Sequence, residues 1–161
     1  MISTRIENKE AFRFIGFKTA LAEGTSIHDT RYSPLKTAFF KSMIEGGQMA
    51  TLRPLSESNY GFAAVAREPG GIYYYAGVPS TQPVPSSADE LPFPQSEYLV
   101  LSGSGGLSRL AFDRLEDYAF GSVLNDEYEY VYNGNPIAEV LLNGNPMDAE
   151  VEVWVPVIKR S

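Results

Sequence analysis

Cysteine is absent from the 161 residues of this sequence. The absence excludes disulfide bonds, thiolate metal ligands and cysteine nucleophiles. It also fits a reducing compartment, so we expect a cytoplasmic protein. The first residues, MISTRIENKEAF, lack the basic segment and long apolar stretch of a secretory signal peptide.

Runs of basic residues and long apolar stretches are missing too. The 13 Lys and Arg residues are outnumbered by 20 Asp and Glu, which gives a formal net charge of −7. Because neutralising phosphates needs clustered Lys and Arg, we predict no direct nucleic-acid binding. An acidic field favours cationic ligands, and an equally good explanation is that the charge keeps the protein dissolved. No apolar run approaches the roughly 20 residues that span a bilayer, so we expect no membrane insertion.

Catalytic and metal-binding motifs are scarce. His28 is the single histidine, and no G-x-S-x-G motif occurs, so a triad with Asp29 is not favoured. Residues 103–106, GSGG, lack the full G-x-G-x-x-G pattern and the P-loop lysine, and we interpret them as the turn before a helix. The acidic residues between Asp126 and Glu129 lack EF-hand spacing. We therefore predict neither a metal site nor a cofactor.

Aromatic residues are plentiful by contrast. The chain has ten tyrosines, nine phenylalanines and one tryptophan. Tyrosine combines apolar area with a polar tip, which suits ligand-binding surfaces as well as half-buried strands. We interpret the excess as an indication of an aromatic-lined pocket.

The order of predicted elements repeats between the two halves of the chain. In residues 1–78 we expect strands at 2–6 and 11–21, a turn at 24–26, a helix at 34–44, a loop or weak strand at 49–58, and strands at 60–67 and 72–78. In residues 97–161 we expect a strand at 97–102, a helix at 107–123, and two strands flanking the turn at 143–148. Residues 79–96 are rich in proline and small polar residues, which indicates a connector without regular structure over most of its length.

This pattern predicts a single α+β domain over residues 1–161. We expect two pseudo-repeated β-α-β-β units side by side, with antiparallel sheets, each covered by its helix. The groove between the two units is the default position for a ligand.

One carboxylate in the second half stands out. Glu139 lies in a predicted strand among Ile137, Val140 and Leu141. A charged group there must face solvent or be buried against something that offsets its charge. In the last strand, Val153 and Val155 share one face with their valine neighbours, and Trp154 lies on the other.

Three stretches of the chain resemble a known family when taken in order. They are YGFAAVAREPGGIYYYAGV, then YLVL followed by a glycine turn and a helix, then PIAE followed by EVEVWVPV. In order and spacing these stretches are similar to the GyrI-like, or AraC effector-binding, domain superfamily. Its members include multidrug-sensing domains of transcription regulators, stand-alone single-domain relatives and gyrase-inhibitory proteins.

The resemblance implies a site around Glu139. It makes Glu139 the acidic residue at the bottom of a drug pocket, with Leu141 where the family usually has an aromatic residue. We expect Trp154 to make up that aromatic surface, and we expect burial in the empty pocket to raise the pKa of Glu139. The candidate wall residues are all strand aromatics: Tyr60, Phe62, Tyr73, Tyr75, Tyr98 and Trp154.

The favoured function is binding of a small, hydrophobic, cationic organic molecule, as a stand-alone effector-binding or transcription-related sensor. Desolvating a cation is costly, and a buried carboxylate with aromatic neighbours offsets that cost. The N-terminal segment is too short and strand-like for a helix-turn-helix module, so we expect any regulation of transcription to occur without a DNA-binding domain of its own, or through a partner. Two alternatives stay open. One is a hydrolase of reactive electrophiles that uses Glu139 with Tyr60 or Tyr75, and the other is a protein-binding inhibitor of the gyrase-inhibitor type.

Overall fold

The computed structural model describes residues 2–22 and 26–161 of the chain, so the turn expected at 24–26 lies largely outside the described residues. The first half contains β1 (Ser3–Lys9), β2 (Phe12–Ala22), a 3-10 turn (Thr30–Tyr32), α1 (Ser33–Glu45), α2 (Gln48–Leu52), a 3-10 turn (Arg53–Leu55), β3 (Gly61–Glu68) and β4 (Gly71–Pro79). The second contains β5 (Asp89–Phe93), β6 (Ser96–Ser104), α3 (Ser108–Tyr118), a π turn (Ala119–Val123), β7 (Tyr130–Tyr132), β8 (Ile137–Leu141) and β9 (Glu150–Lys159).

The strands form one antiparallel sheet with the order β1-β6-β9-β8-β3-β4-β2-β5, and β7 pairs with β9. Strands β2, β4 and β3 come from the first predicted unit, and β6, β9 and β8 come from the second. The two units are joined where β3 pairs with β8, and β1 of the first half also crosses over to pair with β6 of the second. The predicted α+β fold of two repeated units is therefore confirmed, with the strands of both units joined edge to edge in a single sheet.

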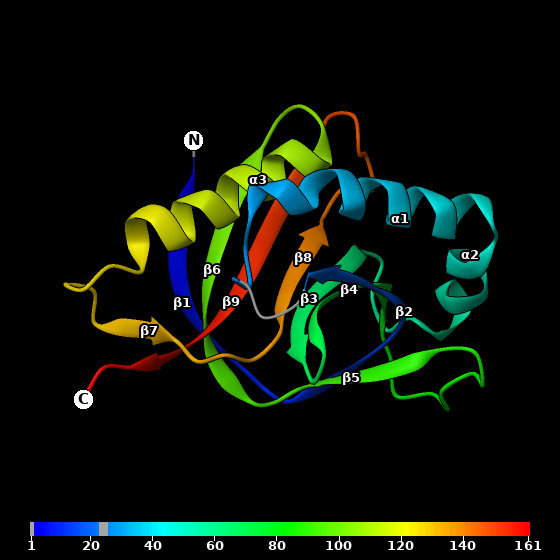
Figure 1. The fold of residues 1–161 in the computed structure, drawn as a ribbon, viewed down its shortest axis with the longest axis horizontal. Coiled ribbons are helices and arrows are strands. Elements are labelled where there is room, and N and C mark those ends of the chain that lie inside the picture. The colour runs from blue at the N-terminus through cyan, green and yellow to red at the C-terminus, as the bar shows by residue number, and fades with distance from the viewer. Residues whose placement is uncertain (1, 23–25) are drawn as a thin grey trace.

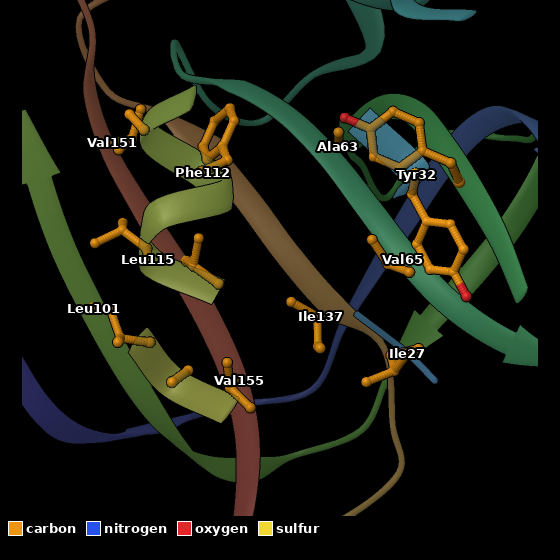
Figure 2. Close-up of a cluster of buried hydrophobic side chains, with 14 of the residues drawn as sticks. Ile27, Tyr32, Ala63, Val65, Leu101, Phe112, Leu115, Ile137, Val151 and Val155 are labelled. Carbon is orange, nitrogen blue, oxygen red and sulfur yellow. The ribbon is translucent and has the colours of Figure 1, made fainter. Parts of the chain in front are cut away.

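The two faces of this sheet carry separate apolar clusters because side chains alternate along each strand. One cluster lies beneath the helices and includes Val153 and Val155 of β9 with Leu115 of α3. Figure 1 shows α1 and α3 over this same face, with the start of α1 beside α3. Figure 2 shows Phe112 and Leu115 of α3 in this cluster, together with Leu101, Val151 and Val155 of the strands.

The other face carries an aromatic cluster, and the sheet curls around it. The ring of Phe12 in β2 lies 6.2 Å from that of Trp154 in β9, although β8, β3 and β4 separate these strands in the sheet. Phe12 also stacks on Phe93 of β5, with ring centroids 4.5 Å apart. A flat sheet would hold β2 and β9 far apart, so these contacts require strong curvature.

Some predicted segments differ from the observed elements. The connector at 79–96 contains β5, and Pro92 fits there because β5 is an edge strand, where a missing backbone donor is tolerated. Residues 49–58 form most of α2 and a 3-10 turn, where we expected a loop or weak strand. The second helix keeps α-geometry only to Tyr118 and continues as a π turn. Within residues 2–22 and 26–161, every helix is too short or too polar to traverse a bilayer.

Candidate functional site

Glu139 lies at the middle of β8, where the two units join. It is opposite Ala63 of β3 and Val153 of β9, and its side chain is completely buried, with 0% exposure. Ala63 and Val153 belong to the cluster under the helices, so Glu139 faces α1 and α3. The predicted central groove is therefore closed over this carboxylate.

Three side chains donate hydrogen bonds to Glu139. Lys36 of α1 places its Nζ 3.0 Å from Oε2. Arg109 of α3 binds both oxygens, with Nη2 2.8 Å from Oε2 and Nη1 3.0 Å from Oε1. The hydroxyl of Tyr74 in β4 donates to Oε1 at 2.8 Å. The carboxylate thus holds two cations from two different helices, which satisfies its charge within the protein.

A second buried acid, Glu116 of α3, extends this arrangement. Its Oε1 lies 3.5 Å from the ammonium of Lys36, and its Oε2 lies 3.5 Å from Nη2 of Arg109. Arg109 also binds Asp113 at 2.8 Å, and the hydroxyl of Ser33 at the start of α1 donates to Asp113. Ion pairs and a hydrogen bond therefore tie α1 to α3 and to the sheet.

His28 connects the buried cluster to Asp117, which is more than half exposed. Its Nε2 lies 2.6 Å from Oδ1 of Asp117, and its Nδ1 lies 3.6 Å from Oε1 of Glu116, beyond hydrogen-bonding distance. The imidazole also stacks on Phe120. We call the connected ionisable residues the charge network: His28, Lys36, Arg109, Asp113, Glu116, Asp117 and Glu139.

The two buried acids have opposite pKa shifts. Burial alone would raise the pKa of Glu139, but the charges of Arg109 and Lys36 outweigh it and hold that pKa well below the usual range. Our expectation of a raised pKa is wrong because internal cations already occupy the site. Burial and the negative charge of Glu139 raise the pKa of Glu116, although Lys36 partly offsets them.

Local sequence accounts for how the helices present these groups. Arg109, Asp113 and Glu116 are four and three residues apart on α3, so they share one helical face. Ala111 and Leu115 bury the adjoining face against the sheet. On α1 the buried residue is Lys36 itself, and it shares a face with partly buried Phe39 and Phe40.

The aromatic residues predicted as pocket walls lie elsewhere. Trp154 pairs with Ala138, the neighbour of Glu139, so its ring points to the opposite face of the sheet. It stacks there under the ammonium of Lys9, which is 3.9 Å from the ring centroid. We had expected Trp154 to lie beside Glu139, and this expectation is wrong. Leu141, two residues after Glu139, does lie on the same face as Glu139.

The remaining wall candidates share the face of Trp154 or its rim. Phe62, Tyr75 and Tyr98 are buried in the aromatic cluster, and Tyr73 packs partly buried against it. Tyr60 is 46% exposed and contacts Phe62. Because the side-chain period of a strand is two, each of these strand positions points away from the charge network. That these aromatic residues contact a ligand stays a prediction. Such a ligand would lie on the face of the sheet opposite to Glu139.

Sequence reasoning missed Tyr74, Lys36 and Arg109. The alternation Tyr73-Tyr74-Tyr75 separates Tyr74 from its neighbours, but only the register of β4 with β3 shows which face is that of Glu139. On α3, charged residues at 109, 113 and 116 next to an apolar stripe were an available signal of a buried polar face.

Two surface hollows lie away from Glu139. One, of about 580 Å³, lies between the turn after α1 and β2, with Phe17, Phe39, Met43 and Gln48 among its lining residues. The other, of about 450 Å³, is lined by Ile2, Arg114 and the glycine turn before α3. Neither contains a member of the charge network, which leaves the buried network as the stronger candidate site.

A family model for integron-associated effector binding proteins, Cass2, matches residues 5–157. The chain belongs to the Cass2 family. This membership bears out the resemblance to GyrI-like effector-binding domains. The comparison with curated protein sequences found no match.

Solved structures share the Cass2 fold at low sequence identity. SAV2435 bound to tetraphenylphosphonium is similar with a TM-score of 0.78 and 16% identity, over 97% of this chain and 94% of that one. An integron cassette protein from the mobile metagenome of Vibrio cholerae has a TM-score of 0.63 and 11% identity, over 96% and 95%. The EcmrR C-terminal domain has a TM-score of 0.63 and 10% identity, over 99% of both chains. At these identities the likeness shows the fold.

Proposed function

We propose that this Cass2-family domain binds a small organic cation at Glu139 and acts as an effector sensor in transcription regulation. The observation that carries the proposal is the position of Glu139. It is an ionised carboxylate, completely buried at the join of two repeated units and beneath both main helices. A pseudo-symmetric join of this kind is a common place for ligand sites.

The energetics of the charge network favour a binding role over a purely structural one. Burying ion pairs carries a large desolvation cost, and well-packed apolar residues of similar volume are often as stabilising or more so. The network keeps Lys36, Glu116 and Glu139 at 1% exposure or less. A gain in stability is therefore a weak explanation for this arrangement, and a buried carboxylate is a group that a cationic ligand can use.

The sign of the network favours a cation. It holds four carboxylates against the two cations Lys36 and Arg109, with His28 as a titratable third. An entering anion would meet this excess of negative charge. Two aromatic rings also face the internal cations, since Lys36 Nζ lies 5.3 Å from the ring of Tyr74 and Arg109 lies 5.5 Å from that of Phe112. Aromatic faces attract cations by roughly 0.5–2 kcal/mol each.

The similar structures support the same proposal. SAV2435, which shares the fold, was solved with tetraphenylphosphonium, a lipophilic cation. EcmrR, whose C-terminal domain shares the fold, is known in a complex with DNA. These relatives support a cationic effector and a regulatory role for this chain.

The geometry does not favour the hydrolase alternative. The tyrosine next to Glu139 is Tyr74, whereas the hydroxyl of Tyr75 donates to Glu68, and Tyr60 lies on the rim of the other face. A general base works best with a pKa near the operating pH. The lowered pKa of Glu139 makes it a weak base and leaves it without a proton to donate at neutral pH.

Calorimetric titration with tetraphenylphosphonium and with neutral triphenylphosphine oxide tests the proposal. We expect saturable binding of the cation by the wild-type protein, and at least tenfold weaker binding by Glu139→Gln. Glu129→Gln is the matched control, because Glu129 is an exposed carboxylate that pairs with Lys159 at the surface. Circular dichroism at the titration temperature checks that each variant is folded.

Two outcomes would contradict the proposal. Absence of binding to the wild-type protein would exclude this class of ligand at the site. Unchanged affinity in Glu139→Gln, or equal affinity for the neutral compound, would show that recognition does not depend on the buried carboxylate.

A further inference from the structure

The two cations that bind Glu139 are held in the protein to different degrees. Arg109 makes a two-point contact with Glu139 and also pairs with Asp113 and Glu116. Lys36 makes one contact with Glu139 at 3.0 Å and one with Glu116 at 3.5 Å. Lys36 therefore has fewer and longer contacts to give up.

The helices that carry these cations also differ. On α3, Ala111, Phe112 and Leu115 are buried in the apolar cluster, so Arg109 stands on a firmly packed element. On α1 the buried side chain is Lys36, while Leu35 is 48% exposed and Ile44 is 58% exposed. Besides Lys36, α1 attaches through the partly buried rings of Phe39 and Phe40 and the hydrogen bond from Ser33 to Asp113. Unlike α3, it has no fully buried apolar side chain, so shifting α1 uncovers less apolar surface than shifting α3.

We infer that Lys36 is a built-in occupant of the effector site, and that an effector binds by exchanging its cation for the Lys36 ammonium. The inference rests on the proposed function. It makes Lys36 a residue that determines specificity, because the exchange keeps the charge of the network constant only for a ligand with one positive charge. A neutral ligand in the same place would leave Glu139 and Glu116 with Arg109 as their remaining buried cation.

The exchange has two consequences. Every effector must compete with Lys36, so its apparent affinity is lower than the site would otherwise provide. The released Lys36 loses the contacts that hold its helix, so binding frees α1 while α3 stays packed. Ligand binding is thereby converted into a displacement of one surface helix.

Chemical rescue of Lys36→Ala tests whether an ammonium is the natural occupant. Propylammonium replaces the three side-chain carbons and the nitrogen that this substitution removes. We expect propylammonium to raise the Tm of Lys36→Ala saturably, by several degrees, and to leave the wild type unchanged. Propanol is the neutral control compound, and Lys18→Ala is the matched variant, because Lys18 pairs with Glu68 at the surface.

Competition with an effector is tested by the affinity for tetraphenylphosphonium. We expect Lys36→Ala to bind this cation at least tenfold more tightly than the wild type, and Lys18→Ala to bind it as the wild type does. Lys36→Met removes the charge and keeps most of the side-chain volume. It replaces Lys36→Ala in the affinity measurement if Lys36→Ala does not fold without propylammonium. Hydrogen exchange should show faster exchange at 33–45 and unchanged exchange at 108–118 when the wild type is saturated.

The outcomes separate this inference from the proposed function. If tetraphenylphosphonium binds the wild type, Lys36→Ala and Lys36→Met with equal affinity, the proposed cation binding is supported and the proposed exchange with Lys36 is wrong. If propylammonium rescues Lys36→Ala but no variant binds tetraphenylphosphonium, the ammonium position is supported and the proposed ligand is wrong. If propylammonium and propanol act equally on Lys36→Ala, the position recognises volume and the inference is overturned.

Discussion

The helices α1 and α3 occupy equivalent places in the two repeated units, yet they are attached to the sheet by different forces. Helix α3 buries Ala111, Phe112 and Leu115 against the strands (Figure 2). Helix α1 buries Lys36, and its larger apolar side chains are exposed or partly buried. The most buried contact of α3 is therefore apolar, whereas the most buried contact of α1 is an ion pair.

This difference matters because the two forces respond to different conditions. Apolar burial depends little on pH and on small charged ligands. An ion pair in the interior depends on the protonation of its members and on any competing charge. We therefore expect the position of α1 to change with pH and with charged ligands more than the position of α3 does.

The largest effect is expected from breaking the contact between Lys36 and Glu139. Lys36→Met and Glu139→Gln should each lower the free energy of unfolding by about 3–5 kcal/mol, because each removes one partner of a buried charge and unbalances the charge network. The double variant should lose less than the sum, because both partners are then neutral. Urea denaturation of the four proteins gives the coupling energy, and strictly additive losses would contradict a direct charge pair.

A somewhat smaller effect is expected from the apolar attachment of α3. Leu115 has 0% exposure, so Leu115→Ala should cost about 2–5 kcal/mol through lost burial and the cavity left behind. Unlike the loss in Lys36→Met, this loss should be the same at pH 6 and pH 8. A strong pH dependence of the Leu115→Ala effect would show that α3 is also held mainly by charge.

The third prediction concerns pH. Burial would lower the pKa of His28, but the carboxylates of Glu116 and Asp117 outweigh both burial and the charge of Lys36 and raise it above 6.5. The stabilisation from protonated His28 should therefore be complete below about pH 6.5 and be lost as pH rises through the raised pKa. Denaturation midpoints from pH 5.5 to 9 should show this decline in the wild type and a flatter profile in His28→Gln.

The smallest effect is expected on the exposed side of α1. Leu35→Ala should change stability by about 0.5 kcal/mol or less, because Leu35 is 48% exposed and packs little against the sheet. The same denaturation measurement, beside Leu115→Ala, compares one leucine from each helix. If Leu35→Ala lowers the free energy of unfolding about as much as Leu115→Ala does, the proposed difference between the two helices is wrong.

Much of the fold was predictable because it depends on local spacing. The repeat of a strand, a helix and two strands is visible from alternation at 60–67 and from the helical stripe after residue 107. The glycine turns and the proline in the first turn of α1 were equally local signals. The segments that we assigned wrongly, β5 and α2, are short, and their form depends on pairing with β2 and on packing beside β4.

The candidate site was only partly predictable. Glu139 was recognisable as a carboxylate in an apolar strand, but its partners were not. Lysine is almost never fully buried without a partner, so nothing in the sequence around Lys36 indicated that its side chain is buried. Trp154 was correctly placed on the face opposite the valines of its strand, but Glu139 was wrongly expected beside it, because the register pairs Glu139 with Val153.

By itself, the sequence determined the order of elements, the internal repeat and the acid placed in a buried strand. These features follow from propensities and periodicities within a few residues along the chain. Only the tertiary structure decided what meets that acid, because Lys36 and Glu139 are 103 positions apart and Arg109 is 30 positions from Glu139. The pairing of β3 with β8 brings these helices over one carboxylate, and no local pattern records that register.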